Sequence, residues 1–186
     1  MRFVLAGARA VLELPIHSSV LFVLVHPHYP ENVGAAARAI KTMGFTQLAL
    51  VKPGRLAIPE HEMAHKMAVK SWDVLSAARI FSTIEEATSE SKIVAVTTSR
   101  SGVSGIESPR EFSNRAFDAA VCGTKVAILF GNEKTGLSSD IVDRFSHKIR
   151  IPMAAEQPSI NLAQSTQLVA YELFVTALNR RFESSP

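Results

Sequence analysis

The feature that most constrains the fold is a set of short, continuous runs of aliphatic residues. Val20 to Val25 has the sequence VLFVLV, and similar runs occupy Gln47 to Val51 (QLALV), Lys92 to Thr97 (KIVAVT) and Lys125 to Phe130 (KVAILF). A strand that is apolar at every position is buried on both faces, which is typical of a parallel sheet covered by helices. The runs therefore predict an α/β fold with a mostly parallel sheet and flanking helices.

Helical patterns lie between these runs, as the crossover connections of a parallel sheet require. Glu31 to Met43 is alanine-rich with the apolar spacing of a helix, and Gly44 is its expected C-cap residue. Ligands of such sheets bind beyond the carboxyl ends of the strands, so the site is expected in the loops after Val25, Thr97 and Phe130. Further helices are expected at residues 59–69, just after Thr83, at 109–120 and at 160–181, and further strands at 78–81 and 147–151.

Composition limits the class of protein. The 186 residues are 47% hydrophobic, enough for one domain with its own core. Cys122 is the only cysteine, which precludes an intrachain disulfide and suits a reducing cytoplasm; we expect it to be a small core residue. The net charge of +3 permits an anionic partner without requiring one.

No apolar run reaches the roughly 18 residues needed to span a bilayer, so we expect a cytoplasmic protein with no membrane partner. Arg9 and Glu13 interrupt the apolar start of the chain, which argues against a signal peptide. Residues 1–17 are interpreted as an N-terminal extension, and residues 18–186 as a single domain.

Three segments place glycine or polar residues after a buried strand or at the start of a helix. They are Pro30 to Ala39 (PENVGAAARA), Leu129 to Ser138 (LFGNEKTGLS) and Ile151 to Glu172 (IPMAAEQPSINLAQSTQLVAYE). In the first, Asn32 is a candidate N-cap, and Arg38 lies about one and a half turns further along the helix. Each segment alone also suits an ordinary capped helix or turn.

Glycines mark the second segment and polar capping side chains mark the third. Gly131 and Gly136 let the backbone approach a ligand closely, and Asn132, Glu133 and Lys134 between them offer an amide, a carboxylate and a cation. In the third segment, Ser159 or Asn161 is the expected cap of the long final helix, whose first N–H groups suit an anionic ligand.

Taken together and in this order, the three segments resemble the three signature motifs of the SpoU family of RNA 2′-O-ribose methyltransferases, within the SPOUT superfamily. NVGAAARAIKTMGF resembles the first motif, LFGNEKTGLS the second and IPMAAEQPSINLAQSTQLVAYEL the third. The resemblance extends from about Leu21 to Leu178. It implies that residues 18–186 are a SPOUT methyltransferase catalytic domain with a trefoil knot near the C-terminus, an exception to the rule that chains are un-knotted.

The resemblance also implies the cofactor, S-adenosyl-L-methionine, and the site residues. Arg38 is expected to hold a phosphate beside the target ribose and to stabilise the developing 2′-alkoxide, because an arginine is too rarely deprotonated to be a general base. The implied catalytic residues are Asn32, Arg38, Glu133, Ser159 and Asn161. The implied cofactor-binding residues are Thr97, Thr98, Ser99, Leu129, Gly131, Asn132, Ile151, Pro152, Ser159, Ile160, Asn161 and Leu162.

The partners implied by the resemblance are RNA and a second copy of the chain. The chain is most similar to the TrmJ-like branch, whose members modify tRNA at nucleotide 32 of the anticodon loop, while rRNA stays open as the substrate. A homodimer is expected, in which Arg38 of one subunit completes the site of its partner.

Two other functions remain open. One is a catalytically silent RNA-binding protein of the same fold. The other is a zinc peptidase, because His61 to His65 (HEMAH) matches the H-E-x-x-H pattern in which two histidines bind zinc. No third ligand follows nearby, since the next histidine is His147, and no metal site is therefore expected.

Overall fold

The computed structural model describes residues 12–155 and 159–183. Its strands are β1 (Val20–Val25), β2 (Gln47–Val51), β3 (Arg79–Phe81), β4 (Ile93–Thr97), β5 (Ile106–Glu107), β6 (Val126–Phe130) and β7 (His147–Ile149). In the described chain these seven strands form one sheet in the order β3-β2-β1-β6-β4-β7-β5. All six pairings between them are parallel, which confirms the sheet predicted from the aliphatic runs.

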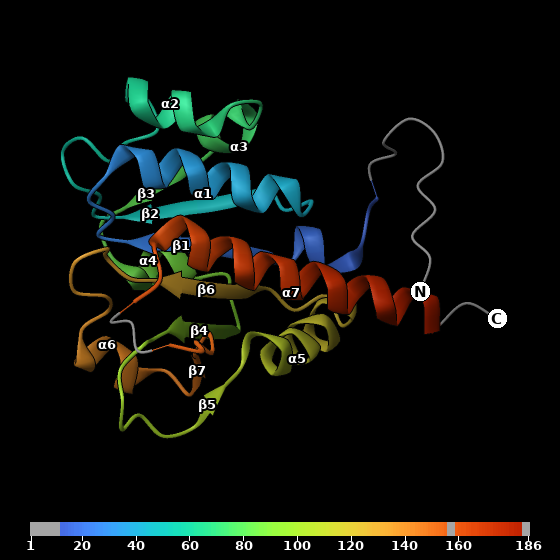
Figure 1. Ribbon diagram of the computed structural model, residues 1–186. Helices are drawn as coiled ribbons and strands as arrows, with labels where there is room; N and C mark the ends of the chain where they lie inside the picture. The colour runs from blue at the N-terminus through green and yellow to red at the C-terminus, as the bar shows by residue number, and fades with distance from the viewer. Residues whose placement is uncertain (1–11, 156–158, 184–186) are drawn as a thin grey trace.

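Helices cover both faces of this sheet (Figure 1). They are η1 (Pro15–Ser18), α1 (Pro30–Thr42), α2 (Glu62–Ala68), α3 (Trp72–Ser76), α4 (Ile84–Thr88), α5 (Pro109–Val121), α6 (Ser139–Arg144) and α7 (Leu162–Glu183). Successive residues of β1 point to opposite faces. Phe22 and Leu24 join the core under α1, α2, α3, α5 and α7, whereas Val23 and Val25 join the core under α4 and α6. None of the helices in the described residues has the length and apolar character to cross a membrane.

The ends of α1 show which local signals decide a helix boundary. At its C-terminus the C-cap residue is Met43, and Gly44, the expected cap, follows it with φ +89°. The N–H groups of Gly44 and Phe45 donate to the carbonyls of Lys41 and Ile40, so a glycine ends the helix one position after its cap. At its N-terminus the prediction is wrong. The N-cap is Tyr29, because Pro30 is preorganised for the first helical position and leaves Asn32 inside the first turn.

The chain before β1 contributes to the core. Leu14 and Ile16 are buried within the larger hydrophobic cluster, and the His17 ring lies between Phe45 and Phe174. Burial lowers the pKa of His17. Residues 1–11 of the expected extension lie outside the described residues, as do residues 156–158 of the segment expected to thread the knot.

One residue expected in the core is exposed. Cys122 follows the last turn of α5 as its C-cap residue, and its side chain is accessible to solvent. The prediction that it is a small core residue is therefore wrong, because the helix ends at Val121 before the chain turns back into the sheet.

Val69, the C-cap residue of α2, has a strained backbone conformation. Its φ of 54° and ψ of −105° are unfavourable for a β-branched side chain, and the side chain is 47% exposed and so loses little packing if removed. Val69→Gly is expected to raise the free energy of unfolding by about 1 kcal/mol, since the relief of strain exceeds the entropy that glycine adds to the unfolded chain. Urea denaturation measures this difference.

Val121→Gly is the matched control for Val69→Gly. Val121 is also an exposed valine at a helix end, but it has helical geometry, so glycine there is expected to lower the free energy of unfolding by about 0.5–1 kcal/mol. Equal losses in the two variants would show that Val69 is not strained.

Candidate functional site

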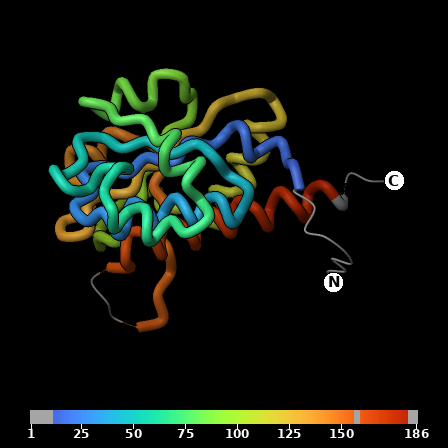
Figure 2. The backbone as a smooth tube through the Cα atoms, turned by 90° about the horizontal axis from the view of Figure 1, so that it is seen from above, coloured from blue at the N-terminus to red at the C-terminus, as the bar shows by residue number. Residues whose placement is uncertain are grey.

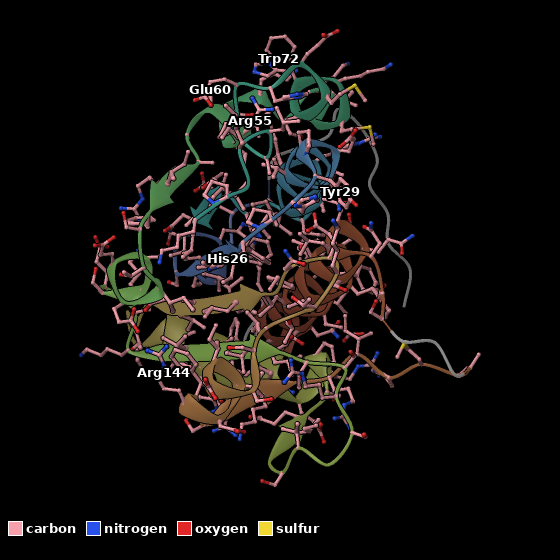
Figure 3. The ribbon with its side chains drawn as sticks, turned by 90° about the vertical axis from the view of Figure 1, so that its left-hand side faces the viewer. His26, Tyr29, Arg55, Glu60, Trp72 and Arg144 are labelled. Carbon is pink, nitrogen blue, oxygen red and sulfur yellow. The ribbon has the colours of Figure 1, made fainter. Side chains whose placement is uncertain are left out.

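A cavity of about 220 Å³ opens beyond the carboxyl ends of β4, β6 and β7, the edge of the sheet seen in Figure 3. Its walls combine buried apolar side chains with hydroxyl, amide and backbone groups. In Figure 2 the orange trace that follows β7, as far as residue 155, projects away from the body of the molecule. The cavity is lined by residues 97–100, 130–137, Ile149, Ile151, Met153, Ser159, Ile160, Leu162 and Ser165.

Glu133 connects two of the three motif segments at the rim of this cavity. Its Oε2 accepts a hydrogen bond from the backbone N–H of His28 at 2.9 Å. Its Oε1 accepts from the N–H of Tyr29 at 3.3 Å and from the side-chain amide of Asn32 at 2.8 Å. A carboxylate offers only acceptors, so it suits three converging donors. The loop after β6 is thereby fastened to the start of α1.

Asn161 brings in the third segment. Its Nδ2 donates to Oδ1 of Asn32 at 3.0 Å, while its own Oδ1 accepts from the N–H groups of Ala163 and Gln164 at 2.9 and 3.3 Å. Asn161 is therefore the N-cap of α7, one of the two candidates that the sequence offered, and Ser159 is not. Its side chain also completes a continuous chain of hydrogen bonds from Glu133 through Asn32 to the final helix.

The loop after β6 is closed tightly around Asn132. The Asn132 Oδ1 accepts from the N–H groups of Lys134 and Thr135 at 2.7 and 3.2 Å, and its Nδ2 donates to the carbonyl of His26 at 2.8 Å. A Cβ at Gly131 would lie 2.3 Å from the backbone carbon of Gly136. Only glycine at position 131 permits this approach of the two ends of the loop.

The loop after β4 is anchored to both neighbouring strands. The Thr97 hydroxyl donates to the carbonyl of Leu129 at 3.0 Å, and the Thr98 N–H donates to the carbonyl of Ile149 at 2.9 Å. The Thr98 hydroxyl then accepts from the N–H of Arg100 at 3.2 Å. These bonds hold one wall of the cavity in a fixed conformation.

The structure brings most of the predicted site residues together. Of the residues predicted to bind cofactor, the following line the cavity: Thr97, Thr98, Ser99, Gly131, Asn132, Ile151, Ser159, Ile160 and Leu162. Leu129 contributes its carbonyl to Thr97 but buries its side chain in the sheet, and Pro152 is exposed outside the lining. Asn32 donates to Glu133, which lines the cavity, and Asn161 donates to Asn32.

Arg38 lies apart from this cavity. It is exposed on α1 and borders a second, largely apolar hollow between α1 and α7. No hydrogen bond or ion pair joins its side chain to another side chain within the described residues. The hollow is lined by Ala35, Arg38, Ala39, Thr42, Ile160, Ala163, Gln164, Gln167 and Leu168.

The two histidines of the HEMAH segment are used in local packing. His61 is the N-cap of α2, and its Nδ1 accepts from the N–H of Met63 at 3.1 Å. The ring of His65 makes an edge contact with Trp72, with 4.9 Å between the ring centroids. Within residues 12–155 and 159–183, no group of three or more histidine, cysteine or acidic side chains is arranged to hold a metal ion.

The cation expected between Gly131 and Gly136 is Lys134, which lines the cavity. Its Nζ lies 3.2 Å from Nε2 of His28 and 5.8 Å from the centre of the Tyr29 ring, two residues to which the sequence analysis assigned no role. The feature that could have pointed to His28 and Tyr29 is their position directly between β1 and α1, at the carboxyl ends of the strands. Leu137 and Ser165 also line the cavity and carried no such signal.

The model of the SpoU rRNA Methylase family matches residues 19–171. Among curated proteins, the tRNA (cytidine/uridine/adenosine-2′-O-)-methyltransferase TrmJ of Pseudomonas aeruginosa is 36% identical over 153 residues, which cover 81% of this chain and 58% of that protein. TrmJ of Yersinia pestis is 35% identical over 170 residues, covering 90% and 65% of the two chains. The chain thus spans less than two thirds of the length of these relatives.

Solved structures show the same fold. A probable methyltransferase from Bordetella pertussis superimposes with a TM-score of 0.80 at 33% identity, covering 87% of this chain and 96% of that chain.

Proposed function

Because this chain belongs to the SpoU methylase family, we propose that it transfers a methyl group from S-adenosylmethionine to a ribose 2′-hydroxyl of RNA. The observation that carries the proposal is the hydrogen-bonded chain Glu133–Asn32–Asn161. This chain joins all three motif segments at the rim of one cavity. If the segments were only separate turns and helix caps, their side chains would have no need to bond to one another. Such fixed positioning of two reactants accounts for much of the catalysis in a reaction without a covalent enzyme intermediate.

The cavity fits S-adenosylmethionine. The side chains of Phe130, Leu137, Ile149, Ile151 and Leu162 offer apolar contact for a purine ring, while Thr98, Ser99 and Ser159 offer hydroxyls and backbone groups for the ribose and the amino acid part. When bound, the cofactor supplies an electrophilic methyl group on a positively charged sulfur. The chain's own residues bind it, orient the RNA and exclude water.

Arg38 is proposed to act in a homodimer. The apolar hollow beside it runs between α1 and α7. We propose that a second copy covers this hollow and that each subunit brings its Arg38 to the cavity of its partner. There the guanidinium would grip a phosphate and a ribose oxygen with its planar set of donors, and would stabilise the negative charge that develops on the 2′-oxygen. The exposure of Arg38 and its separation from the cavity of its own chain support this role.

We propose tRNA as the substrate, supported by the names of the curated relatives, with anticodon-loop nucleotide 32 as the position to test first. The family model is named for rRNA, which makes rRNA the second candidate. Incubation of the purified protein with labelled S-adenosylmethionine and total tRNA or rRNA, followed by mapping of the modified nucleotide, decides between them. Cofactor binding without methylation of either RNA would instead favour a catalytically silent RNA-binding protein.

Cofactor binding gives a separate prediction. Calorimetry is expected to show one S-adenosylmethionine site per subunit, with the same heat in the presence and absence of a chelator, because the cavity is lined without a cluster of metal ligands in the described residues. Binding that disappears with the chelator would contradict this and would direct attention back to His61 and His65.

A further inference from the structure

An exposed aromatic ring stands at the rim of the cavity. Tyr29 is 44% exposed and lies between β1 and α1, on the face of the molecule that Figure 3 shows. Among the described residues, the other exposed aromatic side chains of comparable size are Trp72 on α3 and Tyr171 on α7. The backbone N–H of Tyr29 donates a hydrogen bond to Glu133, which lines the cavity, whereas the Trp72 ring packs against His65 of α2.

The backbone around this ring is held firmly. The N–H groups of His28 and Tyr29 both donate to the Glu133 carboxylate, and buried Pro27 and Pro30 flank them. A side chain on such a fixed backbone loses little entropy when it binds a ligand. The ring is therefore preorganised in a way that a surface tyrosine on a free loop is not.

Cationic and protonatable groups adjoin the same ring. The Lys134 Nζ lies 5.8 Å from the ring centre and 3.2 Å from the His28 Nε2, and the His28 ring meets the Tyr29 ring at 90° with 4.8 Å between their centres. Lys134 and His28 therefore contact each other as well as the tyrosine ring. The ring and the ammonium group together offer a stacking surface next to a site for an anion.

This pairing of chemistries matches an unpaired nucleotide. Bases that are not in a helix stack on aromatic side chains, and lysines neutralise the neighbouring phosphates. We infer that Tyr29 stacks on an unpaired base next to the ribose that is methylated, with Lys134 holding an adjacent phosphate. The inference rests on the proposed function for its RNA substrate, and it adds the residues that recognise the nucleotide beside the reacting one.

The test compares Tyr29→Leu, which removes the ring, with Tyr29→Phe, which keeps it. The affinity for labelled total tRNA is measured by fluorescence anisotropy, and the KM for the same RNA by methylation. Loss of one stacked base is expected to weaken RNA binding roughly fivefold to a hundredfold in Tyr29→Leu. Tyr29→Phe is expected to stay within about twofold of the wild type, and S-adenosylmethionine affinity to stay unchanged in both.

Salt dependence separates the two partners. Lys134→Gln is expected to reduce the slope of log affinity against log salt by about one, as for the loss of one phosphate contact, whereas Tyr29→Leu leaves the slope unchanged. Val121→Ala is the control, because it trims an exposed hydrophobic side chain at the end of α5 that precedes β6, away from the cavity. It is expected to change neither RNA affinity nor KM.

Three results would overturn the inference. Unchanged RNA affinity in Tyr29→Leu excludes stacking, and equal losses in Tyr29→Phe and Tyr29→Leu assign the effect to the hydroxyl instead. If the wild type binds neither tRNA nor rRNA, both the inference and the RNA substrate fail. If the wild type binds tRNA but methylates no RNA, only the proposed activity fails, and the binding data still decide whether Tyr29 stacks.

Discussion

Arg38→Ala is expected to lower the rate of methyl transfer by roughly a hundredfold to a thousandfold while leaving S-adenosylmethionine affinity unchanged. The side chain is exposed on α1 and does not line the cavity, so its removal spares the proposed cofactor site. A donor that stabilises a developing oxyanion typically contributes about 2.7–4 kcal/mol to the transition state. Single-turnover methylation at saturating RNA, run beside a cofactor titration, measures the two quantities separately.

Arg38→Lys is the matched control for geometry. It keeps the charge but loses the planar pair of donors, so it is expected to recover only part of the rate. Near-normal turnover in Arg38→Ala would remove the residue from the mechanism, and lost cofactor binding would make its role structural.

Co-expression of two variants tests the proposal that each site is shared between two subunits. Co-expression of Arg38→Ala with a variant in the cavity loops is expected to form heterodimers that regain activity at one of their two sites. Complete absence of rescue would contradict a shared site, even if Arg38 proves essential.

Much of the fold was predictable because buried parallel strands appear in the sequence as continuous apolar runs. β1 and β2 begin and end at the predicted residues, and β4 and β6 each begin one residue later than predicted. A run of apolar residues that is bounded by polar residues or proline leaves little choice of where the strand begins and ends. The capping pair Thr83 and Glu86 likewise marks α4 in the sequence and forms the expected reciprocal hydrogen bonds.

Short elements escaped prediction for the opposite reason. The helices α3 and α6 have five and six residues, fewer than two helical turns, and β5 has two, so no hydrophobic period repeats within any of them. Their positions depend on packing against neighbours, such as Val142 of α6 against the sheet, which no local pattern encodes.

The site was predictable as a set of residues but not as a set of contacts. The sequence gives Asn32 the chemistry of an N-cap, yet its side chain bonds to Glu133 and Asn161, which are 101 and 129 positions away. Tertiary hydrogen bonds of this separation have no local signature. The cap of α7 could be narrowed to Ser159 or Asn161 because the partners of a capping side chain, here Ala163 and Gln164, lie two and three residues further along the chain.

Glu133→Gln is expected to have the second large effect, because it changes one oxygen of the central acceptor into a donor. If the amide oxygen occupies the Oε1 position, the NH₂ group faces the N–H of His28; if it occupies the Oε2 position, the NH₂ faces both Tyr29 and the Asn32 amide. Either orientation opposes donor to donor. The free energy of unfolding is expected to fall by about 1–3 kcal/mol, as for the loss of a hydrogen bond to a charged group.

Glu133→Gln is also expected to lower activity, in a way that differs in kind from the effect of Arg38→Ala. Displacement of the loop after β6 by about 1 Å costs roughly a hundredfold in rate. S-adenosylmethionine affinity should fall as well, because Gly131 and Asn132 of the same loop line the cavity.

Glu60→Gln, an equivalent change at an exposed carboxylate, is expected to leave rate, affinity and stability unchanged. Calorimetry, urea denaturation and single-turnover methylation of both variants make the comparison. Unaltered cofactor affinity in Glu133→Gln would mean that Asn132 alone holds the loop through His26, and that the chain from Glu133 to Asn161 positions only the RNA side of the site.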